Sequence, residues 1–203
     1  MSLTAKRDAF RRLHETGTFL LPNPWDIGSA KLLAGLGFQA LASTSAGMSW
    51  AMGRPDYGVE RDTMLAHLKL LSAATDLPLN ADFENGFAHD ADGVAANVTL
   101  AVEAGVSGLS VEDSTGDKAN PLYDVDLAVA RIAAARAAID RTGSGVLLTA
   151  RCEAFLVGVN DLDEAIRRLK AYSDAGADCL YAPFLPDLDA TAAVIQAAGP
   201  KPV

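Results

Sequence analysis

The chain has 203 residues, half of them hydrophobic, so it can bury a complete core as one domain. Its formal net charge of −9 and its lack of a basic cluster argue against nucleic acid or an anionic membrane surface as a partner. No stretch approaches the ~20 apolar residues of a membrane span. The charged N-terminus, MSLTAKRDAFRRLHE, lacks the apolar segment of a signal peptide.

The two cysteines, Cys152 and Cys179, lie in strand-like segments and form neither a C-x-x-C pair nor a disulfide framework. We therefore expect a protein of the reducing cytoplasm, with both thiols buried in structural positions.

Short apolar segments alternate with amphipathic, alanine-rich segments along the whole chain. Asp26 is the expected N-cap of the second helix, and Ser43 to Gly47 is expected to be a small polar loop. The predicted strands are 18–22, 38–43, 78–82, 108–111, 146–150 and 179–182, with the entry to a seventh at 201–203. The predicted helices are 3–16, 27–34, 60–75, 91–104, 124–141, 161–175 and 187–198.

This alternation is typical of a parallel sheet whose strands are buried on both faces. The sheet could be an open doubly wound one or a (β/α)₈ barrel. No G-x-G-x-x-G fingerprint follows the first strand, which weakens a dinucleotide-binding interpretation. Polar residues instead recur at the carboxyl ends of successive strands, where a barrel has its active site; they are Ser43, Asp82, Glu112 and Arg151.

We therefore expect an α/β fold of the (β/α)₈ TIM type, with residues 1–203 forming a single barrel domain. Only seven strands can be counted, so the barrel is expected to be C-terminally incomplete, without its last strands and its C-terminal helix.

The segment from Leu77 to Ala88, LPLNADFENGFA, carries the strongest chemical signal. Because side chains alternate along an extended segment, Asp82 and Glu84 would point the same way. Two converging carboxylates are unfavourable unless a positive charge lies between them, and Mg²⁺ prefers such oxygen ligands. The alternative is two solvated acids on a loop, since a D-x-E pair is common and weakly specific.

Six motifs follow one another in a characteristic order between about residues 18 and 182. Together they resemble the isocitrate lyase / phosphoenolpyruvate mutase family. They are N-x-x-D-x-x-S-A (23–30), S-T-S-A-G (43–47), G-R-P-D (53–56), D-F-E-N-G-F (82–87), V-E-D (111–113) and A-R-x-E-A-F (150–155).

The resemblance implies Mg²⁺-dependent chemistry on small 2-oxo or hydroxy acids through an enolate-like intermediate held by the metal. Family metal sites are gathered by acids that match Asp56, Asp82, Glu84 and Glu112, several of them through water. Mn²⁺ is an alternative cation. The implied substrate is a small anionic carboxylate or phosphonate. The resemblance also implies a homo-oligomer, because family members are commonly tetramers that exchange a C-terminal helix.

By the same resemblance, Arg151 matches the arginine that grips the substrate carboxylate or the transferred group, and its planar fork suits that task. Ser43, Thr44 and Ser45 match the loop that cradles the substrate carboxylate, and Asp56 is expected to contribute to substrate binding as well.

The segment after the fourth predicted strand, residues 115–124, departs from the lyases of the family, which carry K-[KR]-C-G-H there. It has no cysteine and no histidine, which argues against a standard isocitrate or methylisocitrate lyase. Its K-A-N-P-L-Y-D stretch is similar to the gating loop of the phosphonate branch, so Lys118 and Asn120 are the candidates for transition-state contacts on a closing loop.

Residues 181–184 also lack the acid that family lyases carry near the end of the sixth strand. The sequence therefore leaves the bond that is broken open. Three functions remain: a lyase or mutase acting on a C–C or C–P bond, an oxaloacetate decarboxylase or hydrolase, and a non-catalytic barrel that binds Mg²⁺ and a carboxylate.

For four further residues the sequence allows either a role in the site or an ordinary structural or solvated position. Glu153 could orient Arg151 or pair with another neighbour. Tyr57, beside Asp56, could roof the site or simply pack there. Arg131 is expected on a solvated helix face together with Arg136 and Arg141, and His89 on a solvated loop.

Overall fold

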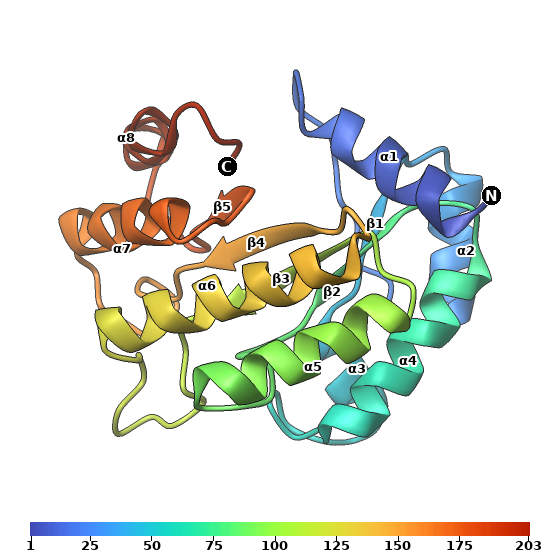
Figure 1. Cartoon of the computed structure of the whole chain (residues 1–203), viewed down its shortest axis with the longest axis horizontal. Coiled ribbons are helices and arrows are strands. Elements are labelled where there is room, and N and C mark those ends of the chain that lie inside the picture. Colours follow the sequence, from blue (N-terminus) through green and yellow to red (C-terminus); the bar gives the residue numbers. More distant parts are fainter.

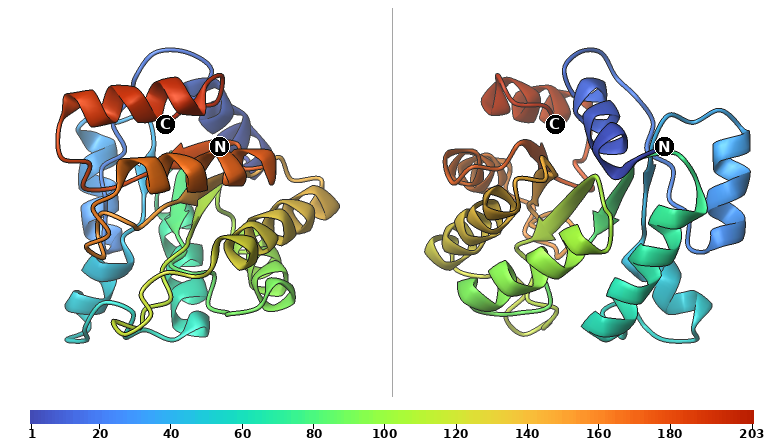
Figure 2. Two further views of the ribbon diagram at one scale, coloured as in Figure 1. Left: turned by 90° about the vertical axis from the view of Figure 1, so that its left-hand side faces the viewer. Right: turned by 45° about the vertical axis from the view of Figure 1, so that its right-hand side comes forward.

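The computed structural model describes residues 1–203 and shows five parallel strands hydrogen-bonded in the order β1-β2-β3-β4-β5 (Figure 1). A strand order that never reverses distinguishes this sheet from a doubly wound one, which reverses at a switch point. The sheet is curled, so it forms part of a barrel wall (Figure 2), which confirms the predicted TIM-type architecture. The strands are β1 (Leu41–Ala42), β2 (Leu79–Asp82), β3 (Gly108–Glu112), β4 (Leu147–Arg151) and β5 (Cys179–Tyr181).

Eight helices accompany the sheet, and those from α4 onward contact one another in chain order along its outer side (Figure 1). They are α1 (Leu3–Leu13), α2 (Ile27–Gly35), α3 (Ser45–Ala51), α4 (Arg61–Ala74), α5 (Ala91–Glu103), α6 (Val125–Thr142), α7 (Leu162–Asp174) and α8 (Leu188–Ala198). None of them combines the length and the apolarity that crossing a bilayer would require.

Aspartate caps begin several of these helices where the sequence predicted a start. The Asp26 carboxylate accepts a hydrogen bond from the Ser29 amide at 2.7 Å, and the Ser29 hydroxyl accepts one from the Asp26 amide at 3.1 Å, which completes a capping box. Asp90 and Asp187 cap α5 and α8 in the same way, each at 2.8 Å. Because such a cap satisfies amides that have no partner within the helix, it fixes the first turn from local sequence alone.

The two faces of the sheet differ in chemistry. Toward the helices the strands present apolar side chains that are fully buried in the main core, namely Leu79, Ala81, Leu109, Val111, Leu148, Ala150 and Leu180. The opposite face is polar, with Asp82 beside Ser110 and Glu112 beside Arg151 in the strand register. The prediction of strands buried on both faces is confirmed for β3 and met only in part by β2 and β4, whose inner residues Asp82 and Arg151 keep 16% and 17% of their side chains exposed.

Helix α1 closes the end of the sheet at which the strands begin. The Phe10 ring packs with Ala40 and Leu147 in a small second core, and Arg7 donates to the carbonyl oxygens of Val102 and Val106. The amino ends of the strands are thus covered, and the polar residues at their carboxyl ends lie on the opposite side.

Two predicted strands and one predicted loop differ from the structure. Residues 18–22 and 201–203 are not strands, although Pro22 and Pro202 each accept one sheet-like hydrogen bond, from Ala42 and Leu180. A proline has no amide to donate, which weakens the ladder on both sides. The polar loop after β1 ends early, because the Thr44 side chain caps α3 and the helix begins at Ser45.

We predict that Gly108→Ala lowers the free energy of unfolding by about 1–3 kcal/mol. A β-carbon at residue 108 would lie 2.5 Å from the Phe10 ring and 2.6 Å from the Asn80 side-chain oxygen, so α1 would have to shift. Urea unfolding measures the effect. Gly35→Ala is the matched control: a β-carbon there meets nothing within 4 Å, so stability should be unchanged or slightly raised. Equal stabilities of the two variants would contradict the assigned packing of α1.

Candidate active site

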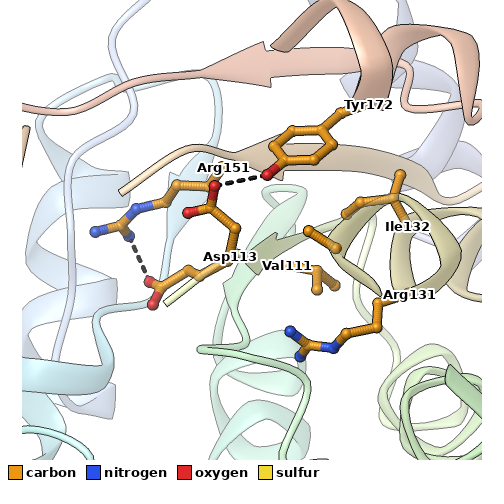
Figure 3. Close-up of a pocket in the computed structure, with 8 residues that line it drawn as sticks. Val111, Asp113, Arg131, Ile132, Arg151 and Tyr172 are labelled. Carbon is orange, nitrogen blue, oxygen red and sulfur yellow. Dashed lines mark hydrogen bonds and ion pairs between the residues drawn. The ribbon is translucent and has the colours of Figure 1, made fainter. Parts of the chain in front are cut away.

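The centre of the candidate site is Arg151, at the carboxyl end of β4. Its Nη1 lies 3.0 Å from Glu112 Oε1 at the end of β3 and 3.4 Å from Asp82 Oδ1 at the end of β2. Only 17% of the arginine side chain and 4% of the Glu112 side chain are exposed. The ion pair to the acid on β3 is drawn as a dashed line in Figure 3. Charges this deeply buried persist only when they are compensated, so these three residues depend on one another.

Glu153 holds the other edge of the guanidinium. Its Oε1 accepts a hydrogen bond from Arg151 Nε, and its own amide donates to Asp113 Oδ1 at 2.7 Å. Of the two interpretations that the sequence left open for Glu153, the structure supports the one in which it orients Arg151. Burial raises the pKa of Glu153, and the charge of Arg151 opposes that effect.

Asp82 is fixed by the segment that follows β1. The amide and the hydroxyl of Ser45 both donate to Asp82 Oδ2 at 2.8 Å, and Ser43 accepts a hydrogen bond from the Asp82 amide at 2.9 Å. The hydroxyl of Thr44 points elsewhere, since it accepts the Gly47 amide as the cap of α3. Ser43 and Ser45 are thus joined to the cluster through Asp82, whereas the Thr44 side chain is not.

Glu84 and Asp56 complete the acidic side of the site. Glu84 is 2% exposed, and its Oε1 has no hydrogen-bond partner. Burial, together with the charges of Asp82 and Asp56, raises the pKa of Glu84 to about 8. Asp56 lies exposed on the loop between α3 and α4. Partial desolvation raises its pKa, the charge of Asp82 adds to this, and the Tyr57 amide and Arg151 oppose it.

The predicted Mg²⁺ ligands therefore share an electrostatic environment. Burial raises the pKa of Glu112, Arg151 opposes the effect, and Asp82 and Glu153 reinforce it. Clustered carboxylates that raise one another's pKa, with one buried oxygen left unpartnered, suit a hard divalent cation in their chemistry. As the side chains stand, Arg151 is the positive group between Asp82 and Glu112, and no three Asp, Glu, His or Cys side chains are grouped closely enough to share a metal ion.

The predicted gating residues Lys118 and Asn120 lie on the loop that joins β3 to α6. Both are exposed, and neither side chain makes a hydrogen bond or an ion pair. The loop is pinned at its base by an antiparallel bridge between Ser114 and Leu122. The two residues thus lie at the exposed tip of a loop with a closed stem, and neither is hydrogen-bonded or ion-paired to the Arg151 cluster.

Three buried residues of this region were not singled out from the sequence. Asp113, next to Glu112, accepts a hydrogen bond from the Tyr172 hydroxyl at 2.6 Å (Figure 3). It accepts another from Arg168 Nη1 at 3.1 Å. Its partners come from α7, far along the chain, so only the adjacency of two acids in V-E-D could have signalled the position. This network joins the ends of β3 and β4 to α7.

The expectation of a solvated face is wrong for Arg131, which is 1% exposed. Helix α6 turns it toward the loop after β2, where its Nη2 donates to the carbonyl oxygens of Asn85 and Ala88. Its guanidinium also lies 3.8 Å from the centre of the Tyr123 ring. The Tyr123 hydroxyl in turn is 2.7 Å from His89 Nδ1, and His89 itself is an exposed loop residue, as predicted.

A barrel enzyme has its active site at the carboxyl ends of the strands, and the cluster around Arg151 lies at that end. The fold and the site thus define an enzyme of the TIM-barrel class. The chain belongs to the phosphoenolpyruvate phosphomutase family, whose family model matches residues 10–203, as the motifs indicated. It is thereby placed among the enzymes of the phosphoenolpyruvate mutase/isocitrate lyase superfamily.

Three similar proteins illustrate the range of this superfamily. A solved protein from Burkholderia cenocepacia J2315, assigned only provisionally as a lyase or mutase, is 50% identical with a TM-score of 0.95, over 98% of this chain and 72% of that one. The 2-methylisocitrate lyase of Escherichia coli K12 is 31% identical over 93% of this chain and 65% of that protein. A phosphonopyruvate hydrolase, solved with oxalate and Mg²⁺, is 27% identical with a TM-score of 0.86, over 97% of this chain and 70% of that one.

The chain is shorter than these relatives. It covers between 53% and 67% of the lengths of the curated proteins that it matches. The activity and the substrate of a complete family member are therefore carried to this chain only as proposals.

We predict that the metal-free protein loses stability as the pH rises from about 5 to about 8. In this range folded Glu84, with its pKa near 8, holds a proton that the unfolded chain has released, so unfolding becomes more favourable as the pH rises. Each unit of pKa difference corresponds to about 1.4 kcal/mol. Urea unfolding at several pH values in EDTA measures the slope.

Glu84→Gln should make that slope shallower, because glutamine does not titrate. The control is Glu103→Gln at the exposed end of α5, which should leave the slope unchanged. A slope that is the same in wild type and Glu84→Gln would contradict the raised pKa of Glu84.

Proposed function

We propose that the chain is the barrel of a Mg²⁺-dependent enzyme that cleaves or rearranges a C–C or C–P bond next to a 2-oxo acid or related carboxylate. The observation that carries this proposal is the meeting of Arg151 with Asp82 and Glu112 at the carboxyl ends of three neighbouring strands. Such chemistry needs an anion-binding arginine and acids able to hold a cation within reach of the same small substrate.

In this proposal Asp56, Asp82, Glu84 and Glu112 hold the cation, several of them through water. When bound there, Mg²⁺ would supply a Lewis acid that offsets the negative charge developing on an enolate oxygen. Mn²⁺ is the proposed alternative. The unpartnered oxygen of Glu84 supports its inclusion, since a buried carboxylate oxygen without a donor is otherwise unfavourable.

Arg151 binds the substrate carboxylate in this proposal. Glu153 fixes its Nε and the two strand-end acids fix Nη1, which leaves Nη2 without a hydrogen-bond partner. A guanidinium held on two edges presents its remaining donors in one direction, which favours recognition of a planar carboxylate.

Two further groups of residues act around that substrate in the proposal. The segment Ser43 to Ser45 lines the carboxylate, and its two serines hold Asp82 in place. Lys118 and Asn120 reach the substrate only if the loop tip folds over the mouth, and their exposure is consistent with such a closing movement.

The alternative is a barrel that binds a cation and a carboxylate without turnover. This alternative is favoured because no cysteine at the carboxyl ends of the strands is placed to donate a proton. Cys152 is 1% exposed, and burial raises the pKa of its thiol. Burial likewise raises the pKa of Cys179 to about 11, so neither cysteine replaces the one in the loop of the family lyases.

The functional test offers the protein three substrates, separately, in Mg²⁺: oxaloacetate, phosphonopyruvate and 2-methylisocitrate. We predict that pyruvate appears with phosphonopyruvate or that oxaloacetate is consumed, and that EDTA abolishes the reaction. A coupled assay detects the pyruvate, and the absorbance of oxaloacetate measures its consumption directly. Binding of oxalate that requires Mg²⁺, without turnover of any of the three, would instead establish the non-catalytic alternative.

We predict that Asp82→Asn abolishes Mg²⁺-dependent binding of oxalate, measured by isothermal titration calorimetry. The substitution keeps the shape that Ser45 recognises but removes one charge from the cation-holding set. The control is Asp163→Asn on the exposed first turn of α7, which should bind oxalate like the wild type. Survival of metal-dependent binding in Asp82→Asn would show that the cation is held elsewhere.

A further inference from the structure

Tyr57 lies beside Asp56 on the loop between α3 and α4, and its hydroxyl donates a hydrogen bond to Glu112 Oε2. The carboxylate therefore has a different partner on each oxygen, since Oε1 pairs with Arg151. Only 4% of the Glu112 side chain is exposed, so solvent cannot replace the tyrosine. The hydroxyl thus determines how the Glu112 carboxylate is turned about its own axis.

The ring of Tyr57 packs against the loop between β3 and α6. A β-carbon on Gly116 would lie 3.2 Å from Tyr57 Cδ1, so the glycine backbone rests directly on the ring. Gly116 has a φ of +76°, a conformation that glycine adopts readily. The hydroxyl of this tyrosine therefore contacts a predicted cation ligand, and its ring contacts the loop that carries Lys118 and Asn120.

The backbone of Tyr57 is unusual for a tyrosine. Its φ is +58°, in the left-handed region that costs a residue with a β-carbon roughly 1–2 kcal/mol. Packing alone would be satisfied by a ring on a relaxed backbone. A strained, partly buried tyrosine with its hydroxyl on an active-site acid is better explained by a role in the site.

We infer that Tyr57 is a positioning residue that joins the loop 114–122 to the carboxylate of Glu112, so that the loop rests in place only when that acid is correctly turned. For the cation-holding role of Glu112 the inference rests on the proposed function. The join itself is a property of the metal-free protein and can be tested there.

The first test is hydrogen–deuterium exchange of the metal-free protein, read at amides 115–117. Tyr57→Phe keeps the ring and removes only the hydroxyl, and Glu112→Gln keeps the acceptor shape and removes the charge. Each should speed exchange about fivefold or more, as expected for the loss of one charge-assisted hydrogen bond. The double variant should exchange no faster than Glu112→Gln alone, because the charge-assisted contact with the tyrosine hydroxyl is already lost there, whereas Glu112→Gln also removes the charge that pairs with Arg151.

The second test is the affinity for Mn²⁺, measured by electron paramagnetic resonance. Tyr57→Phe should weaken it about 10-fold or more, as is usual when the partner of a ligand is removed. Tyr123→Phe is the control, because that hydroxyl contacts His89 and Asn85 and no acid. Its Mn²⁺ affinity should match the wild type, and thermal unfolding should show that both variants are folded.

The outcomes separate the two proposals. If wild type binds no Mn²⁺, the proposed function is wrong, and the exchange cycle alone decides whether Tyr57 joins the loop to Glu112. If exchange is unchanged in Tyr57→Phe, or the two substitutions act additively, the join does not exist. Wild-type Mn²⁺ affinity in Tyr57→Phe would likewise overturn the positioning role.

Discussion

The arrangement of the site at the carboxyl ends of the strands depends on how the positive charge of one buried arginine is balanced by acids. Arg151 contacts the acids that end the two strands before its own in the sheet, Glu112 and Asp82, and a third acid, Glu153, two residues further along the chain. None of these charges would be stable if it were buried without its partner. The carboxyl ends of β2, β3 and β4 must therefore be in place together for the site to form. The same charge balance links the stability of the fold to the function of the site. A ligand or cation that competes with Arg151 for these acids changes the charge balance of the whole cluster.

A second layer of contacts fixes the loops around that cluster. Asp113 joins Arg168 and Tyr172 of α7 to the amide of Glu153, and so supports the residue that orients Arg151. Arg131 anchors the loop after β2 through its carbonyl groups. These residues meet no substrate in the proposal, yet they decide where the acids and the arginine point, as supporting shells do in metal enzymes.

Much of the site was accessible to prediction because strand ends in a parallel barrel share one rim. Asp82, Glu112 and Arg151 were expected together on that ground, and the structure joins them by ion pairs. The solvated position assigned to Arg131 was wrong, because a helical segment does not reveal which of its arginines faces a neighbouring loop. Tyr57 was noticed only as a neighbour of Asp56, since its contact with Glu112 spans 55 residues.

The sequence by itself determined the alternation of β1 to β5 with most of the helices, the Asp26 cap, the family, and the residues placed at the carboxyl ends of the strands. These depend on local hydrogen bonding, on side-chain periodicity and on motifs read in order. Only the tertiary structure decided which side chains touch: that Glu153 orients Arg151, that Thr44 turns away to cap α3, and that Tyr57 lies between Glu112 and Gly116. Such contacts depend on the curvature of the sheet and the course of its loops, which no local pattern encodes.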